Sequence, residues 1–530
     1  MSTILLAVAG SAPLLSRGQA RADQAAPFQV VESSIDQIHA AFRSGKLTAR
    51  QLVQQHLDRI QAYDQQGPRI NSIIALNPMA LEEADRLDAR FRASGLTGPL
   101  HGIPVLVKDE IDTAGMPTTL GTVVFKDYRP PLDAFVVAKV KQAGAIILGK
   151  TTLSEFAAGD TYGSLFGVTR NPYDLERTVG GSSGGSGAAL AANFGTLSLG
   201  EETSASIRRP GGWNAIVSMR PSAGLVSRTG MYDGWPTEHA SMGPMARNVR
   251  DLAILLNVMV GYDPEDPLTA LGVGQAPEDY TQSLDRNGLR GARIGILREP
   301  IGTNSDPDSD DFKKVDAVFE KNVAELKAAG ATVVDPIVIP NLQALLAKRA
   351  RNTVLTDEAL KVWLARNPSS PFQTREDIGN SPDAGKIFPP PKAAAWKSPR
   401  GEPDLFGYGE YLMARQKLLI ALLQVMADHR LDAIAHTTVE HQPSLIRDGT
   451  NPPYVSSRGV PTLNTFLVYV PAITVPSGFT SDDLPVGITF LGRPYSEAVM
   501  LKLAYGYEQA TQHRVPPKTT PALPPRNSSD

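Results

Sequence analysis

A stretch dense in glycine and serine constrains the fold of this chain more than any other feature. Residues 179–211 read VGGSSGGSGAALAANFGTLSLGEETSASIRRPG, in which serines stand among glycines and a second serine cluster precedes Ile207. Glycine allows backbone conformations and close approaches that other residues do not. The stretch therefore predicts a backbone that passes close to another group, and it raises the question of which serine, if any, is chemically active.

Short apolar strands and helices alternate on both sides of this stretch. GIPVLVKDEIDTAG predicts a strand that ends near Lys108, AFVVAKVKQAG predicts a helix, and AIILGK predicts a second strand. An alanine-rich helix is expected from about Gly187, followed by a strand at TLSLG. This β-α-β order is typical of an α/β fold.

The outer parts of the chain give further expectations. Thr48 and Gln51 stand at the spacing of a capping box before a helical pattern. A long helix is expected at 407–429, whereas the three consecutive prolines within 388–403 predict a loop. VPAITVP and PVGITFLG predict strands near the end of the chain. Ser496 is expected to cap a last helix, whose buried residues would be Val499, Met500, Leu503 and Tyr507.

The first 22 residues differ from the rest. The run TILLAVAGSAPLL is too short to span a bilayer, and Ala20-Arg21-Ala22 offers small residues where a signal peptidase cleaves. No charged segment precedes the run. We expect a periplasmic or secreted protein, with a frayed tail on a cytoplasmic protein as the alternative.

The remaining sequence predicts one domain. No linker separates independent units within 23–516, although a region at about 300–430 is less regular and largely helical. The proline-rich end, 517–530, is expected to be an extended tail. We expect no membrane span, because no other stretch is long and apolar enough.

Composition excludes several classes of function. The formal net charge is −3 without a block of basic residues, so we expect no nucleic-acid partner. The chain has no cysteine, which rules out disulfides and thiol nucleophiles. Its eight histidines show no metal-ligand spacing, and we expect neither a metal nor another cofactor.

The sequence contains one match to a nucleotide-binding motif, but its context does not fit that function. Gly144 to Thr151 matches G-x-x-x-x-G-K-[ST], but the four intervening residues are apolar and themselves predict a strand. A phosphate-binding loop has to curl after its strand. We expect no nucleotide site, and we interpret Lys150 as a lysine at a strand end.

A nucleophile-elbow motif is also present. Gly181 to Gly185 matches G-x-S-x-G with Ser183 in the middle, but a polar, proline-containing segment stands where an apolar strand is required. The motif also needs a histidine base late in the chain. The candidates, none in a distinguishing context, are His436, His441 and His513.

A lysine offers another base for a serine nucleophile. A serine hydroxyl is weakly nucleophilic until a base removes its proton, and a neutral lysine can be that base. Lys108 follows the apolar run IPVLV, and burial would lower its pKa. From the strand alone, the alternative is that Lys108 extends to solvent or pairs with Asp109 or Glu110.

Several blocks together resemble one family. GGSSGGSGAALAA and LSLGEETSASIRRP are similar to the defining segment of the amidase signature hydrolases. LHGIPVLVKDEIDTAGMPTTLGT, MRPSAGLVSRTG and LPVGITFLG resemble further blocks of that family, in the same order. The resemblance covers most of residues 30–515 and is weakest at about 300–430. It implies a mixed central β-sheet covered on both faces by helices.

The resemblance also implies a site. Ser206 matches the acyl-forming nucleophile, Ser182 a bridging serine after a cis peptide bond from Gly181, and Lys108 the base. Neutral Lys108 would accept a proton from Ser182, which takes one from Ser206 as Ser206 attacks the amide carbonyl. The expected oxyanion hole consists of the backbone N–H groups of Thr203, Ser204, Ala205 and Ser206.

This sequence departs from the family pattern beside the nucleophile. Ser204 and Ala205 replace two glycines, and Glu202 replaces the commoner aspartate. Either the backbone there avoids positive φ, or these side chains narrow the acyl pocket. Ser204 either adds a hydroxyl to the site or bonds to the local backbone. Arg208 either forms a salt bridge that stabilises the loop or contacts a substrate carboxylate.

Other side chains have two interpretations. Ser183 and Ser186 are expected to be structural. The aromatic and methionine side chains of the central region either line a pocket for an apolar or aryl substrate or belong to the core. They are Trp363, Phe406, Tyr408, Tyr411 and Met413.

The resemblance implies an amidase that hydrolyses an amide C–N bond through a serine acyl-enzyme. We expect a small or aryl/acyl amide as substrate, with ester or carbamate cleavage as side activities. The alternatives are the catalytic subunit of a tRNA-dependent amidotransferase and a catalytically inactive binding protein on the same fold. A homodimer is an expectation from the family alone.

Overall fold

A large mixed β-sheet forms the centre of the protein, as a computed structural model describes it for residues 28–524. The expected signal peptide at 1–22 lies outside the described residues, as does the end of the tail at 517–530. In sheet order the strands are β1 (Ile73–Leu76), β3 (Ile146–Thr151), β2 (Pro104–Lys108), β8 (Leu197–Glu202), β10 (Ser241–Ala246), β9 (Val217–Arg220), β14 (Ala472–Phe479), β15 (Pro485–Leu491), β13 (Ala433–Thr437), β11 (Arg293–Leu297) and β12 (Thr332–Ile337).

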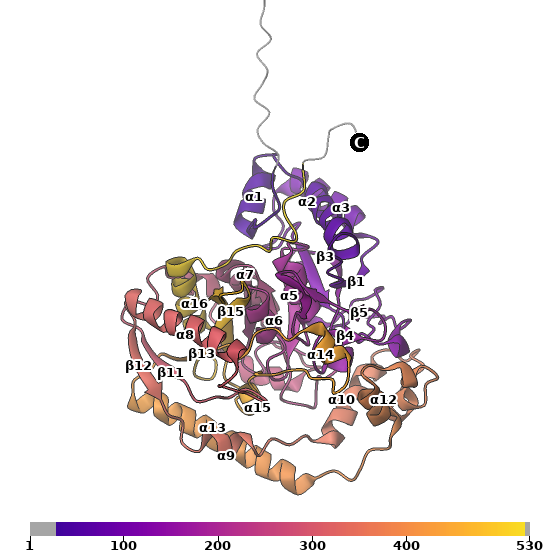
Figure 1. The fold of residues 1–530 in the computed structure, drawn as a ribbon. Coiled ribbons are helices and arrows are strands. Elements are labelled where there is room, and N and C mark those ends of the chain that lie inside the picture. Colours follow the sequence, from indigo (N-terminus) through magenta and orange to yellow (C-terminus); the bar gives the residue numbers. More distant parts are fainter. Residues whose placement is uncertain (1–27, 525–530) are drawn as a thin grey trace, which may run out of the picture.

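Helices surround this sheet, as Figure 1 shows. In chain order they are α1 (Ile35–Arg43), α2 (Ala49–Arg59), α3 (Ala80–Ser94), α4 (Phe135–Gln142), α5 (Gly184–Ala191), α6 (Arg208–Trp213), α7 (Val249–Met259), α8 (Asp310–Ala328), α9 (Leu342–Leu346), α10 (Thr353–Ala365), α11 (Arg375–Gly379), α12 (Pro390–Lys397), α13 (Leu405–Asp428), α14 (Ile446–Thr450), α15 (Leu463–Phe466) and α16 (Glu497–Thr511).

Both faces of the central strands are covered. Every residue of β2, β3, β8 and β10 is buried, so side chains that point to opposite faces are equally shielded. β2 runs parallel to β3 and β8, whereas β10 runs antiparallel to β8 and β9. The predicted mixed sheet between helices is confirmed.

Two local sequence signals produce the expected elements, the start of α2 and the strand β3. At the start of α2, the Thr48 side chain accepts from the Gln51 N–H while the Gln51 side chain accepts from the Thr48 N–H. β3 contains Lys150, so the apolar residues of the nucleotide-motif match do form a strand.

The predicted loop at 388–403 is wrong over α12. Pro389 is the N-cap of this helix and Pro390 begins it. Proline is tolerated in the first turn, because the N–H groups there have no intrahelical partner and the fixed φ suits a helix. The proline run therefore begins a helix instead of excluding one.

The start of α16 also differs from expectation. Ser496 is the N-cap, but its hydroxyl donates to the Arg493 carbonyl at 2.6 Å and makes no cap hydrogen bond to the helix. Met500, Leu503 and Tyr507 are buried as predicted. Val499 is 38 % exposed, so its predicted burial is wrong.

The region at 300–430 adds elements at the margin of the sheet. β12 extends the sheet beyond β11, and α9 and α13 lie side by side along the lower edge of the molecule in Figure 1, with α10 and α12 further right. α13 contributes buried Leu418 and Leu422 to a second apolar core with Leu463. No helix within residues 28–524 has the length and apolar character needed to cross a membrane.

Candidate active site

The ends of two parallel strands and a glycine loop meet at one buried point. β2 ends at Lys108, and the neighbouring parallel strand β8 carries Glu201 near its end. The loop before α5 places Ser182 against them. Lys108 Nζ donates a hydrogen bond to Ser182 Oγ at 2.6 Å, with both residues fully buried.

Glycine is needed where this loop approaches its neighbours. A Cβ on Gly181 would lie 2.3 Å from Ser154 Oγ, and one on Gly185 would lie 2.3 Å from Thr152 Oγ1. The peptide bond between Gly181 and Ser182 is cis. The backbone does pass close to other groups here, as the glycine density predicts.

The other two serines of the loop bond within the fold. Ser183 Oγ donates to the Glu201 carbonyl at 3.0 Å, and Ser186 Oγ lies 2.8 Å from Thr151 Oγ1. These are structural contacts, as expected. Among the described residues, none of the three late histidines hydrogen-bonds to Ser183, and the segment before the loop is the polar strand β7 (Asp174–Thr178).

Ser206 stands on the turn between β8 and α6 and lines a cavity. Its carbonyl accepts a hydrogen bond from the Ser183 N–H at 3.1 Å. Its hydroxyl makes no hydrogen bond to any of residues 28–524, so the expected contact with Ser182 is not formed here. The structure brings Lys108 and Ser182 together and leaves the Ser206 hydroxyl free at the cavity.

The ion pair between Glu202 and Arg208 holds the turn that carries Ser206. Glu202 accepts from the backbone N–H groups of Ile207 and Arg208 at 3.0 Å each, and its side chain pairs with Arg208 at 2.8 Å. Both side chains are at most 1 % exposed. Of the two interpretations of Arg208, the structure supports the loop-stabilising salt bridge.

Ser204 and Ala205 take the place of glycines without backbone strain, because neither has a positive φ. The Ser204 carbonyl accepts from Arg208 Nη2 at 2.8 Å. Within the described chain, no hydrogen bond from the backbone N–H groups of residues 203–206 is formed. They are therefore available to a ligand oxygen.

Two carboxyl groups accompany Lys108. Glu110 Oε1 lies 2.6 Å and Glu201 Oε2 lies 2.8 Å from Lys108 Nζ, and both glutamate side chains are 2 % exposed. Glu110 is a partner that the sequence offered as an alternative, whereas Asp109 pairs with Lys150 at 3.6 Å. Glu201 was missed, and the acidic pair at the end of the TLSLGEE strand is the signal that could have found it.

These carboxyl groups act against the expected neutral state of Lys108. Burial alone lowers the pKa of Lys108, but the neighbouring carboxyl groups of Glu110 and Glu201 outweigh burial and raise that pKa above its usual value. Lys108 is therefore an ammonium. Burial, reinforced by neighbouring Glu201, raises the pKa of Glu110 well above its usual range despite Lys108.

A cavity of about 320 Å³ opens beside Ser206. Its lining includes Ser204, Ala205 and Ser206, and on another side Tyr408 and Tyr411 of α13. Of the two interpretations, both apply to Tyr411, which lines the cavity and is also buried in the second apolar core, with Tyr408 packed against that core. Phe406 and Met413 are 81 % and 57 % exposed, and Trp363 packs in an aromatic cluster with Phe125 and Tyr128.

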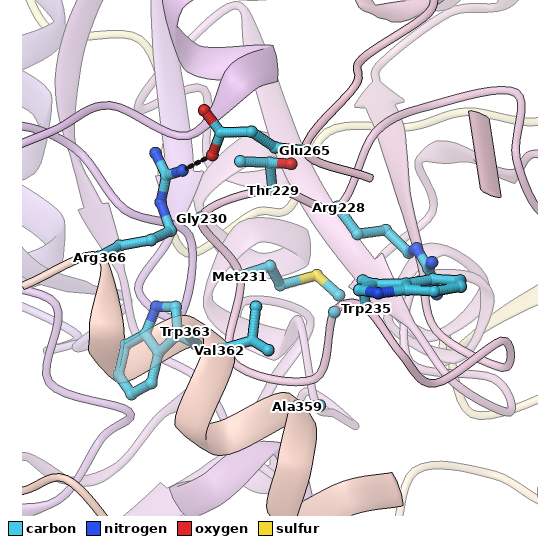
Figure 2. Close-up of a pocket in the computed structure, with 11 residues that line it drawn as sticks. Arg228, Thr229, Gly230, Met231, Trp235, Glu265, Ala359, Val362, Trp363 and Arg366 are labelled. Atoms are coloured by element: carbon cyan, nitrogen blue, oxygen red, sulfur yellow. Dashed lines mark hydrogen bonds and ion pairs between the residues drawn. The ribbon is translucent and has the colours of Figure 1, made fainter. Parts of the chain in front are cut away.

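A smaller cavity of about 60 Å³ lies between α10 and the loop 228–235. Figure 2 shows Met231 and Val362 facing this space, and Arg366 paired with Glu265 at its margin. Lys108, Ser182 and Ser206 do not line it. The larger cavity is therefore the one that belongs to the candidate site.

The chain matches the family model described as Amidase over residues 51–501 and belongs to that family. It is 33% identical to a glutamyl-tRNA(Gln) amidotransferase subunit from Heliobacterium modesticaldum, over 90% of this chain and 96% of the relative. It is 34% identical to the protein of the same name from Halorhodospira halophila, over 91% and 97%.

Solved structures agree on the fold. The native peptide amidase from Stenotrophomonas maltophilia has a TM-score of 0.81 and 34% identity, covering 92% of this chain and 99% of that one. The corresponding glutamyl-tRNA(Gln) amidotransferase subunit from Thermotoga maritima has a TM-score of 0.67 and 27% identity, covering 91% and 95%. The chain is therefore an enzyme that acts on amide C–N bonds.

Proposed function

We propose that the protein hydrolyses an amide through an acyl-enzyme on Ser206. The observation that carries the proposal is the contact between Lys108 Nζ and Ser182 Oγ, which is buried in the interior of the fold while the Ser206 hydroxyl is free at the cavity. A buried amine and a bridging hydroxyl lie on the proton path that a serine nucleophile requires.

In this mechanism Ser206 Oγ attacks the carbonyl carbon and gives its proton to Ser182 Oγ, which passes a proton toward Lys108. The path then reverses, and a proton reaches the nitrogen of the leaving amine as the C–N bond breaks. A water molecule, deprotonated along the same path, releases the acyl group from Ser206.

The developing oxyanion needs donors. The proposed donors are the backbone N–H groups of residues 203–206, which are free in the described chain. Each well-placed donor of this kind contributes about 2.7–4 kcal/mol to transition-state stabilisation. The ion pair of Glu202 with Arg208 would keep these N–H groups in place before the substrate arrives.

The proposed substrate is a small or aryl/acyl amide, with ester and carbamate cleavage as side activities. The two tyrosines of the cavity, Tyr408 and Tyr411, give it one apolar, aromatic side. Esters and carbamates would react through the same type of acyl intermediate on Ser206.

Two unpaired arginines of the cavity, whose lining also includes Glu201, Asp233 and Glu238, favour a substrate that carries an anionic group. Arg349 and Arg351 line the cavity, and neither guanidinium forms an ion pair or hydrogen bond within residues 28–524. The other cavity arginines are paired, Arg209 with Asp160 and Arg415 with Glu238. Two unpaired guanidinium groups would bind a substrate carboxylate.

The curated relatives favour a second candidate function. The two from Heliobacterium modesticaldum and Halorhodospira halophila bear the name of an amidotransferase subunit, which is a component of a larger assembly. The peptide amidase has the higher TM-score of the two solved structures, 0.81 against 0.67, and supports the hydrolase. A release of ammonia from glutamine only when a partner protein is present would select the amidotransferase; hydrolysis of peptide or aryl amides by the isolated chain would select the hydrolase.

Location and assembly are also proposals. The apolar run and Ala20-Arg21-Ala22 favour export to the periplasm or beyond, with a cytoplasmic location as the alternative. A homodimer rests on the family alone.

A fluorophosphonate probe tests the proposed nucleophile. The native protein is expected to become labelled, and Ser206→Ala should abolish the label while Ser183→Ala, a matched serine outside the relay, should keep it. An unlabelled native protein would instead favour the catalytically inactive binding protein.

A further inference from the structure

The proposed mechanism assigns no role to two buried acidic residues that contact Lys108. Glu110 and Glu201 both lie against Lys108 Nζ, at 2.6 and 2.8 Å. Together with Ser182 Oγ at 2.6 Å they surround the amine with three oxygens in a place closed to solvent. Burying charged groups is unfavourable, so a site that holds two acids on one amine calls for a chemical reason.

The proton path also lacks an acceptor at Lys108. An ammonium has three donors and no acceptor, and therefore cannot take a proton from Ser182. Lys108 must first lose one of its own hydrogens. The Glu201 carboxylate lies within hydrogen-bond distance of Nζ and is held by Thr203, whose hydroxyl donates to Glu201 Oε1 at 3.0 Å.

We propose that Glu201 is the terminal proton acceptor of the relay, a positioning residue that acts through Lys108, and that Glu110 stays protonated beside the same amine. The inference rests on the proposed function. As the bond from Ser206 Oγ to the carbonyl carbon forms, the Ser206 proton moves to Ser182 and the Ser182 proton moves to Lys108 Nζ. One Nζ hydrogen moves to Glu201 Oε2.

The charges balance in this step. Lys108 is an ammonium before and after it, Glu201 changes from carboxylate to carboxylic acid, and the negative charge appears on the carbonyl oxygen at the free N–H groups. When the C–N bond breaks, the proton on Glu201 returns through Lys108 and Ser182 to the leaving nitrogen. No co-reactant is required.

Glu110 differs from Glu201 in its protonation state. Two carboxylates beside one ammonium would leave an excess negative charge in a buried site, and like charges at this distance do not both ionise readily. Glu110 keeps its proton, so the charge of Glu201 faces Lys108 alone. Other charged or titratable groups that act on the two glutamates from neighbouring elements are Lys150, Arg220 and Tyr232, and Lys150 itself pairs with Asp109.

Two single variants separate the roles. Glu201→Gln keeps the shape but cannot accept a proton, and we expect kcat on an aryl amide to fall about 100-fold or more with KM within about threefold. Glu110→Gln keeps a neutral side chain and should retain kcat within about tenfold, while the high-pH limb that reflects loss of the Glu110 proton disappears. Equal kcat values for native protein and Glu201→Gln would overturn the proposal.

The double variant Glu110→Gln/Glu201→Gln tests the neutral-lysine alternative. Without either carboxylate, burial would lower the Lys108 pKa, and a neutral lysine could serve as base without help. Our proposal expects this variant to remain at least about 100-fold impaired, whereas activity near the native level would overturn it. Glu201→Asp keeps a carboxyl group on a side chain that is shorter by one methylene, and its kcat should lie between those of the native protein and Glu201→Gln. This variant also tests the proposal if a glutamine variant does not fold.

Failure of this inference differs from failure of the proposed function. If native protein forms no Ser206 adduct with the fluorophosphonate probe, the acyl-enzyme itself is wrong and the inference falls with it. If the native protein labels and turns over, and Glu201→Gln does so equally, only the role of Glu201 is wrong.

Discussion

At the scale of single residues, the sign of one charge decides how the site works. The sequence places Lys108 after an apolar strand, which by itself predicts a neutral amine. The structure adds Glu201 from β8 and Glu110 from the turn after β2, and these neighbouring carboxyl groups reverse the direction of the Lys108 pKa shift. The position of an acid on a neighbouring strand depends on sheet order, and that could not be derived from the local sequence around Lys108.

A buried ion pair gives a prediction on stability. Arg208→Met removes the cation and leaves Glu202 buried without it, so we expect the free energy of unfolding to fall by about 3–5 kcal/mol. Urea denaturation measures this change. Arg86→Met, which breaks the exposed pair with Glu82, is the matched control and should cost about 0.5 kcal/mol or less. Equal losses in both variants would contradict the structural role of Arg208.

At the scale of elements, the sequence predicted most of the scaffold. The capping residues of α2, the strands β2, β3 and β8, and the glycine loop before α5 are present where their patterns indicate. The patterns worked because propensity and burial agree in these elements. The start of α12 was missed because proline excludes the interior of a helix but suits its first turn.

The packing of α2 predicts a pH dependence. His56 of α2 is fully buried, with Nδ1 at 3.1 Å from the Asn193 carbonyl, and burial lowers its pKa to about 3. Below about pH 6.5 His56 is protonated in the unfolded chain, whereas in the folded protein it is protonated only near pH 3. The stability contributed by neutral His56 is therefore complete above pH 6.5 and is lost as pH falls toward 3, by about 1.4 kcal/mol per pH unit at most.

Denaturation of native protein and His56→Gln across pH 3–7 checks this dependence. Glutamine can donate to the Asn193 carbonyl but does not titrate, so the difference in stability between the two proteins should shrink and then change sign as the pH falls. A difference that stays constant with pH would contradict the assigned pKa direction.

At the scale of the whole molecule, the cavity joins parts that are distant in sequence. The turn with Ser206 comes from the central sheet, whereas Arg349, Arg351 and the two tyrosines come from the region at 300–430. The fold and the serine loop could be predicted, because their patterns are local or resemble the family. The lining of the cavity could not, because that region resembles the family least and its side chains meet Ser206 only through tertiary packing.

The unpaired arginines predict a substrate preference. With a matched pair of aryl amides, one bearing a carboxylate and one a neutral amide in its place, we expect a lower KM for the anionic compound. Arg349→Gln/Arg351→Gln should raise that KM about tenfold and leave the KM of the neutral compound unchanged. Equal KM changes for both compounds would show that these arginines do not bind the carboxylate.

The central claim is that Ser206 becomes covalently acylated, with Lys108 and Ser182 moving the proton. Mass spectrometry of protein quenched in acid during turnover of an activated ester tests it most directly. The account predicts an added acyl mass on the peptide that contains Ser206, absent in Ser206→Ala and strongly reduced in Ser182→Ala. An acyl group on Ser182 or Ser183, or turnover without any acylated serine, would contradict it.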